Sequence, residues 1–324
     1  MNKKIIAIAI ATAMAAPVAM ADVKLSGKTV FALSQATGTD ITGAAANFQA
    51  QDTGSKIAID ASAKAGSGAT VFAHLENHVN LADSGSGESG FLGKQRFAFM
   101  GYKAGFGSFT MGSMKSPMKG ATGSHDLFAD TAGDHNGVKA NGLGFTHGAI
   151  QPIQEGSYTE GDSLAVSTKA GGFKIMVSHN LPSDALNSGD TQASISGKAG
   201  PVAVTAAMYS GAKNETYKSM TYLAGKMKFG NIGATLQYQA RTTQASVAST
   251  TTGLGATMKA GNGKAKLQYL MLDNVGTDSD VTFTTVGYDM GLGKGVGVGI
   301  NYTMMTPAKG DGVSILGAGL AMSF

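Results

Sequence analysis

The residues best suited to act on a charged solute lie in one irregular stretch, between residues 114 and 162. Six carboxylates and three lysines fall there, a local balance of 3 − 6 = −3. Such side chains act on ions through Coulomb interactions, worth about 1 kcal/mol per contact in water and more where a passage narrows. The acids expected to act on ions are Asp126, Asp130 and Asp134.

Basic counterparts lie outside this stretch, on segments in which polar and apolar residues alternate. Successive side chains of a β-strand point to opposite faces, so each such segment has one polar face. We expect the polar faces to meet water and to oppose the acids of the stretch. The residues placed there are Lys24, Lys28, Lys56, Lys64, Arg96, Lys174, Lys226, Arg241 and Lys266, with Asp60, Glu76 and Gln237.

Two other kinds of chemistry, metal binding and catalysis, have less support in the sequence. His74, Glu76 and His78 share one strand face, and imidazole and carboxylate suit zinc. Neighbours on such a face lie roughly 6.6 Å apart, however, and alternation alone produces the pattern, so we expect no metal and no cofactor. The chain also lacks Cys and a G-x-S-x-G nucleophile motif, and we predict that it is not an enzyme.

The elements that position these charges are predicted to be β-strands. Sixteen segments alternate with period 2. All five prolines beyond the N-terminal segment fall in links or at segment ends, where no ladder N–H is needed. The segments begin near residues 23, 56, 70, 94, 108, 161, 172, 191, 201, 219, 231, 249, 264, 279, 294 and 312.

Short and long connections alternate along the chain, which indicates an up-and-down meander. Two closed arrangements fit: a soluble barrel or sandwich with an apolar interior, or a membrane barrel with an apolar exterior. Strands of about ten residues match a tilted bilayer crossing, and sixteen strands enclose a space too wide for side chains to fill. We therefore predict an all-β, 16-stranded antiparallel transmembrane β-barrel, because closure also satisfies every backbone polar group in lipid.

Aromatic residues on the apolar faces are expected to form a girdle at the membrane surfaces. Trp is absent, so the girdle rests on Phe and Tyr. The candidates are Phe31, Phe97, Phe109, Phe173, Tyr238, Tyr269, Phe283 and Tyr302.

The N-terminal segment 1–21 has the features of a cleaved export signal. Lys3 and Lys4 precede an apolar run that ends at an A-x-A site, and the run is shorter than a membrane-spanning helix. The remaining chain, 22–324, has 23 basic and 21 acidic residues once these two lysines are removed from the 25. A balance of +2 gives no reason to expect a nucleic-acid partner.

The irregular stretch, about 115–161 as a loop, is too long for an ordinary connection and holds apolar Leu127 and Phe128. We expect it to fold into the lumen and narrow it; the alternative is a surface loop. Residues facing it at the narrowing would include Arg96, Lys56 and Lys24. With an acidic loop and only two arginines in the chain, the expected ion preference is weak and for cations.

Several segments resemble the Gram-negative general-diffusion porins, in particular their Neisseria and beta-proteobacterial branch. They are "DVKLSG", "VFAHLEN", "RFAFMGYKAGFGSFTMGSM", "AGGFKIMVSHN" and the terminal Phe324. The resemblance implies an outer-membrane homotrimer whose third external loop folds inward to form the constriction. One departure is that Thr110 and Ser113 stand where members commonly carry wall arginines.

The function expected from these observations is a water-filled channel for passive diffusion of small hydrophilic solutes and ions. A substrate-specific channel for a sugar or organic acid is the main alternative, followed by a structural or adhesive barrel. Export by a Sec-type signal would lead to the outer membrane of a Gram-negative bacterium, in contact with lipid and lipopolysaccharide. Phe324 resembles the C-terminal signal that barrel-assembly machinery recognises, on a last strand expected to pair with residues 24–33.

Overall fold

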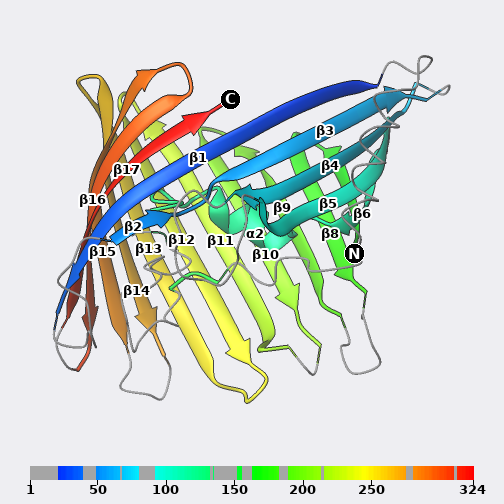
Figure 1. The fold of residues 1–324 in the computed structure, drawn as a ribbon. Helices are drawn as coiled ribbons and strands as arrows, with labels where there is room; N and C mark the ends of the chain where they lie inside the picture. The colour runs from blue at the N-terminus through cyan, green and yellow to red at the C-terminus, as the bar shows by residue number, and fades with distance from the viewer. Residues whose placement is uncertain are drawn as a thin grey trace.

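The computed structural model describes one sheet of antiparallel strands and a short helix (Figure 1). The described residues are 21–38, 49–65, 68–79, 92–131, 134, 152–154, 163–181, 189–212, 215–274, 280–309 and 312–324. The expected signal segment lies outside them, apart from residue 21. No described helix is long and apolar enough to cross a membrane.

The strands follow one another along the chain and around the sheet. Their bounds are β1 Asp22–Thr37, β2 Gln49–Asp52, β3 Lys56–Lys64, β4 Thr70–Val79, β5 Leu92–Ala104, β6 Gly107–Ser113, β7 Ser163–Ala170, β8 Phe173–Asn180, β9 Thr191–Ala199, β10 Val202–Ser210, β11 Tyr217–Phe229, β12 Ile232–Thr243, β13 Ala248–Ala260, β14 Gly263–Asp273, β15 Val281–Gly293, β16 Val296–Pro307 and β17 Val313–Ser323. The helix α2, Pro117–Gly123, lies between β6 and β7.

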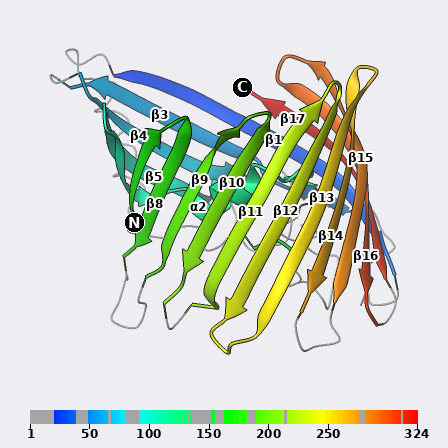
Figure 2. The same cartoon turned by 180° about the vertical axis from the view of Figure 1, so that it is seen from behind.

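The sheet is a closed barrel, because β1 pairs with β17 as well as with β2 and β3 (Figures 1 and 2). Phe31 lies opposite Leu320 across the seam. Both β2 and β3 border the other edge of β1, so they share one position, and 17 − 1 = 16 strands form the wall. The predicted fold class and closure are confirmed, and each predicted segment start lies within two residues of an observed strand start.

The break between β2 and β3 is a bulge in the second barrel strand. Lys28 lies opposite Lys56 and Phe31 opposite Asp52, so three steps along β1 match four on its partner. Ser55, fully buried in the break, replaces the missing ladder contact: its Oγ accepts from the Val30 N–H at 2.8 Å and lies 3.4 Å from the Val30 carbonyl.

The two faces of the wall have opposite character, as β12 illustrates. Leu236 and Tyr238 are 55% and 40% exposed on the outer face, whereas Gln237 and Gln239 between them are buried. The reverse order would hold in a soluble barrel, where apolar side chains fill the interior. The structure therefore places a polar inner face behind an apolar exterior, as the alternation predicts.

Two aromatic residues expected on the outer face point inward instead. Phe97 follows a register shift opposite Glu76, where Arg96 is an extra residue, and the shift reverses the facing of the strand. Phe283 belongs to a patch of buried apolar residues on the inner face of β14–β17, together with Leu270, Met305 and Ile315. Alternation alone cannot reveal either case, because a bulge changes parity and this sector has apolar residues on both faces.

The chain end completes the seam. The Phe324 N–H donates to the Gly27 carbonyl at 3.1 Å, and the Gly27 N–H donates to the Phe324 carbonyl at 3.0 Å. The Phe324 ring covers Gly27 so closely that a Cβ there would lie 2.3 Å from ring atom Cζ. An aromatic end on the outer face is therefore part of the closure.

Replacing Ser55 by Ala should destabilise the barrel by about 1–3 kcal/mol, because the buried Val30 N–H loses its acceptor. Equilibrium unfolding in denaturant from detergent measures this loss. The matched control is Ser62→Ala on β3, whose hydroxyl makes no hydrogen bond among the described residues. An equal effect of the two substitutions would contradict this account of the bulge.

Candidate functional site

The helix α2 lies between the front and back walls of the barrel in both ribbon views (Figures 1 and 2). Ser116 caps its N-terminus, accepting from the Lys119 N–H at 3.2 Å, and Pro117 occupies the first turn, where no N–H is needed. The Met118 N–H donates to the side-chain carbonyl of Gln192 on β9 at 3.2 Å. Met118 is fully buried, so α2 is fixed to the inner wall by one polar and one apolar contact.

Beyond α2 the chain follows the inner wall, held by polar side chains of the strands. Gln237 of β12 donates to the carbonyl of His125 at 3.3 Å. Gln268 of β14 accepts from the Leu127 N–H at 3.2 Å, and Lys266 donates to the Leu127 carbonyl at 2.7 Å. These side chains satisfy backbone groups that have no strand or helix partner of their own.

Leu127 and Phe128 anchor this path by entering spaces that the wall leaves open. A Cβ on Gly255 of β13 would lie 2.8 Å from Leu127, and one on Gly287 of β15 would lie 2.7 Å from Phe128. Phe128 is 1% exposed, and the ammonium of Lys266 lies 4.4 Å from its ring centroid. The apolar pair in an otherwise polar stretch is thus explained by glycines on the facing strands.

A second described part of the same connection, residues 152–154, is fixed in a similar way. The Gln154 N–H donates to the side chain of Gln239 at 2.7 Å, and Gln239 donates to the Gln154 carbonyl at 2.7 Å. The Thr251 hydroxyl donates to the Pro152 carbonyl, and Ile153 is fully buried. The inner faces of β12 and β13 therefore also bind the β6–β7 connection, at residues 152–154.

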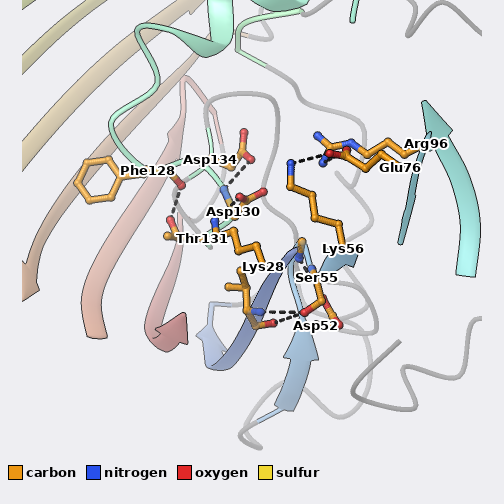
Figure 3. Close-up of polar contacts among 12 residues, drawn as sticks. Lys28, Asp52, Ser55, Lys56, Glu76, Arg96, Phe128, Asp130, Thr131 and Asp134 are labelled. Atoms are coloured by element: carbon orange, nitrogen blue, oxygen red, sulfur yellow. Dashed lines mark hydrogen bonds and ion pairs between the residues drawn. The ribbon is translucent and has the colours of Figure 1, made fainter. Parts of the chain in front are cut away.

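The path ends at β1, where Asp130 accepts from the Lys28 ammonium at 2.9 Å (Figure 3). Asp130 has φ 60°, a left-handed conformation that costs a non-glycine residue about 1–2 kcal/mol. Its N–H donates to Asp134 at 3.3 Å, and its carboxylate lies against Gly54, where a Cβ would be 2.8 Å from Oδ1. The ion pair, the turn contact and the glycine together hold this strained residue.

A basic cluster surrounds one buried carboxylate on the wall of β3–β5. Glu76 is bound by Lys56 and by Arg96, each at 3.1 Å (Figure 3). Burial and the nearby charges of Arg96 and Lys56 lower the pKa of Lys115, which follows β6. The cluster therefore carries more positive than negative charge.

His74 contacts side chains of its own and the neighbouring wall strands. Its Nδ1 lies 2.7 Å from Asp60 on β3, and its ring stacks on Phe99 with centroids 4.9 Å apart. Its Nε2 is 3.9 Å from Glu76. Within the part of the chain that the structure describes, no three His, Cys, Asp or Glu side chains form a group that could hold a metal ion.

A cavity of about 860 Å³ lies between α2 and the inner wall of β3–β11. Phe97, Phe99 and Thr110 line one side. Lys174, Lys198 and Lys226 line the other side and are exposed. None of these three lysines has an ion-pair or hydrogen-bond partner among the described residues.

The three lysines lie close together on neighbouring strands. Lys174 lies opposite Ser196, and Lys198 and Lys226 both lie opposite Ala203, so the latter two are about 10 Å apart across β10. Sequence reasoning placed Lys174 and Lys226 on the polar face but missed Lys198. Its alternation with Gln192, Ser194 and Ser196 was the available signal.

The structure brings together only some of the residues expected to act as a group. Arg96 and Lys56 bind Glu76 rather than the acids of the loop, and Lys24 lies on β1 opposite Asp60. Asp126 accepts from the Phe128 N–H at 2.8 Å, and Asp134 accepts from the Asp130 N–H. The loop acids thus contribute to the loop's own turns, and Asp130 also forms an ion pair with Lys28 on the wall.

A closed barrel of sixteen strands with an apolar exterior and a polar, cavity-containing interior defines a membrane channel. The chain belongs to the Gram-negative porin family, whose model matches residues 7–308. It is therefore an outer-membrane channel for passive diffusion. No curated protein matches the chain.

Solved structures of similar fold include three outer-membrane proteins. The anion-selective porin from Comamonas acidovorans is 17% identical, with 94% of this chain and 100% of that chain covered and a TM-score of 0.70. Salmonella typhi OmpF in complex with daunomycin is 14% identical (93% and 97% covered, TM-score 0.69). A loop L8 deletion mutant of Vibrio cholerae OmpT is 17% identical (94% and 99% covered, TM-score 0.67).

Replacing Phe128 by Ala should loosen the loop from the wall, because the anchor beside Gly287 is lost. The expected loss of stability is about 3–5 kcal/mol, and single-channel current should become noisier. Thermal unfolding and bilayer recording measure the two effects. The control is Phe106→Ala, at a turn residue that is 64% exposed, and it should change neither stability nor current noise. If the Phe128→Ala channel were as quiet as the wild-type channel, Phe128 would not be an anchor of the loop.

Protonation of His125 should weaken the packing of the β6–β7 connection against the inner wall. Burial lowers the pKa of His125, the Ala121 carbonyl opposes this shift and the charge of Lys226 adds to it. The pKa of His125 in the folded protein lies below its unfolded value of about 6.5. The stability that neutral, buried His125 contributes is therefore fully present above about pH 6.5 and is lost as the pH falls through the folded pKa. His125→Gln should therefore flatten the fall in melting temperature between about pH 7.5 and about pH 5.

The control is Phe106→Ala in the exposed turn between β5 and β6, which removes no titratable group and should keep the wild-type pH dependence. Groups that titrate in all three proteins cancel when the curves are subtracted. Parallel curves for wild type and His125→Gln would contradict the stated role of burial.

Proposed function

We propose that the protein is a homotrimeric general-diffusion porin whose passage runs between α2 and the inner wall of β3–β11. The connection between β6 and β7 forms its constriction, since its described residues contact the wall from β9 to β1. The residues that shape the passage or position the constriction are Asp126, Asp130, Asp134, Arg96, Lys56, Lys24, Glu76 and Thr110.

The preferred solutes of this passage are small anions. The observation that carries this proposal is the set of three unpartnered, water-exposed lysines, Lys174, Lys198 and Lys226, in the lining. The acids that led us to expect a weak cation preference accept hydrogen bonds from the loop's own backbone or from Lys28, and none of the three lines the cavity as the structure describes it. The charges that line the passage, rather than the acidic balance of the whole loop, set the field that an ion meets.

General diffusion remains preferred over a substrate-specific channel, because lysines exposed to lumen water are screened by salt and attract anions of many shapes. The Comamonas acidovorans protein of similar fold is described as anion-selective, which agrees in sign. A sugar or organic-acid channel is the alternative. Liposome swelling with solutes of graded size separates the two, since one favoured solute would support specificity.

Assembly and export follow the same family pattern. One similar Vibrio cholerae OmpT structure is described as a trimer form, and the outer face of this barrel exposes large apolar side chains that suit contact with lipid and with other subunits. We retain the proposals that residues 1–21 are a Sec-type signal, that Phe324 is read by the barrel-assembly machinery, that lipopolysaccharide surrounds the protein and that it is not an enzyme.

Replacing Lys174, Lys198 and Lys226 together by Gln should reduce or reverse the anion preference, because it removes the unpaired positive charges of the lining. Reversal potentials across a KCl gradient in a planar bilayer measure the change. The control is Lys294→Gln in the turn between β15 and β16, where an exposed charge is screened within about 10 Å. Cation preference in the wild type would refute the proposal.

A further inference from the structure

A second cavity is bordered by residues 129–131 of the loop and by the wall of β15–β17 and β1, where several neighbouring inward positions are glycines. Gly319 of β17 has Ala32 and Gly299 as its two neighbours, and the next inward position, Gly317, lies between Ser34 and Asn301. This glycine-floored recess has a volume of about 540 Å³.

Asp130 and Thr131 of the loop also line the recess. Three lysines and two aspartates line it: Lys28 binds Asp130 at 2.9 Å and Lys266 binds Asp289 at 2.7 Å. The third lysine, Lys264, is exposed at a position opposite Asp289, so the net charge is small and screened by salt, which admits a neutral solute.

The recess also contains polar oxygens that the protein itself does not satisfy. Ser34, Thr53 and Asn301 all line it and are 3%, 7% and 7% exposed. Among the described residues, Ser34 Oγ, Thr53 Oγ1 and Asn301 Oδ1 have no hydrogen-bond partner. Buried polar atoms without partners are rare and costly, and they commonly mark a place that water or a ligand fills.

Ser34 and Asn301 face each other across a bare position. Both are in register with Gly317, so their backbones are about 10 Å apart with no side chain between them. Two hydroxyls and one amide offer both donors and acceptors, which is the pattern that a solute with several hydroxyl groups satisfies. The volume lies within the range of about 300–1,000 Å³ of small-molecule sites.

We propose that this recess is a binding site for a small, neutral, polyhydroxylated solute such as a monosaccharide. The proposal rests on the proposed channel function, because the solute reaches the recess from the lumen. Bound there, the solute replaces the missing partners of Ser34, Thr53 and Asn301 and lies on the flat floor of Gly299, Gly317 and Gly319.

Saturation-transfer NMR of the detergent-solubilised protein with D-glucose tests this site directly. Wild-type protein should transfer magnetisation to the sugar protons. The Cβ added by Gly319→Val meets only atoms at 3.5 and 3.8 Å, so the side chain can start from the floor without a clash and occupy the recess. The signal should then fall by about fivefold or more, as expected when the displaced solute loses at least one of its hydrogen bonds.

Ser196→Val, on the inner wall of β9 beside the other cavity, is the matched control and should keep the signal. Asn301→Leu, which removes the amide at similar size, should lower it as Gly319→Val does. No transfer to glucose in the wild type, or equal transfer in Gly319→Val, overturns the proposal and indicates that water alone occupies the recess.

Single-channel conductance of the same preparations separates this proposal from the channel function. Gly319→Val and Asn301→Leu should conduct as the wild type does, because Gly319 and Asn301 lie outside the cavity of β3–β11. Loss of glucose binding with normal conductance supports the site. Absence of conductance in the wild type would refute the proposed function instead.

Discussion

Pairing of β1 with β17 is the constraint on which the rest of the structure depends. A strand in lipid has no water to satisfy its N–H and C=O groups, so every edge must be paired. At the seam, residues 28–37 of β1 pair with residues 314–323 of β17. The pairing extends to the last residue, where Phe324 and Gly27 exchange backbone hydrogen bonds. Closure at sixteen strands then creates an interior that the strand side chains alone do not fill.

That interior is organised by what the wall presents to it. Glutamines and lysines on β9, β12 and β14 bind the backbone of the β6–β7 connection, and glycines on β13 and β15 receive Leu127 and Phe128. The connection thereby separates two spaces of different chemistry. One has unpaired lysines suited to anions, and the other has matched ion pairs and unsatisfied hydroxyl and amide groups.

The sequence was sufficient to predict the strands, their closure and the facing of most residues, because alternation repeats in every strand and lipid reverses its usual meaning. The predicted face of the wall was wrong for two aromatic residues. The register shift at Arg96 turns Phe97 inward, and Phe283 lies in an apolar patch on the inner face. Charge pairing could not be predicted, since it depends on the register between neighbouring strands and on the path of the loop. Arg96 is the extra residue at the register shift beside Glu76, and it binds Glu76 rather than the loop acids.

Cross-linking of the loop to the wall tests the central claim most directly, and the chain has no cysteine of its own to interfere. A Cβ on Gly54 would lie 2.9 Å from Asp130 Cγ, so Gly54→Cys with Asp130→Cys places two thiols within disulfide range. We expect the disulfide to form under mild oxidation, with equal single-channel conductance before and after reduction. Failure to form the bond, or conductance that changes on reduction, would show that the loop does not occupy this position in the conducting channel.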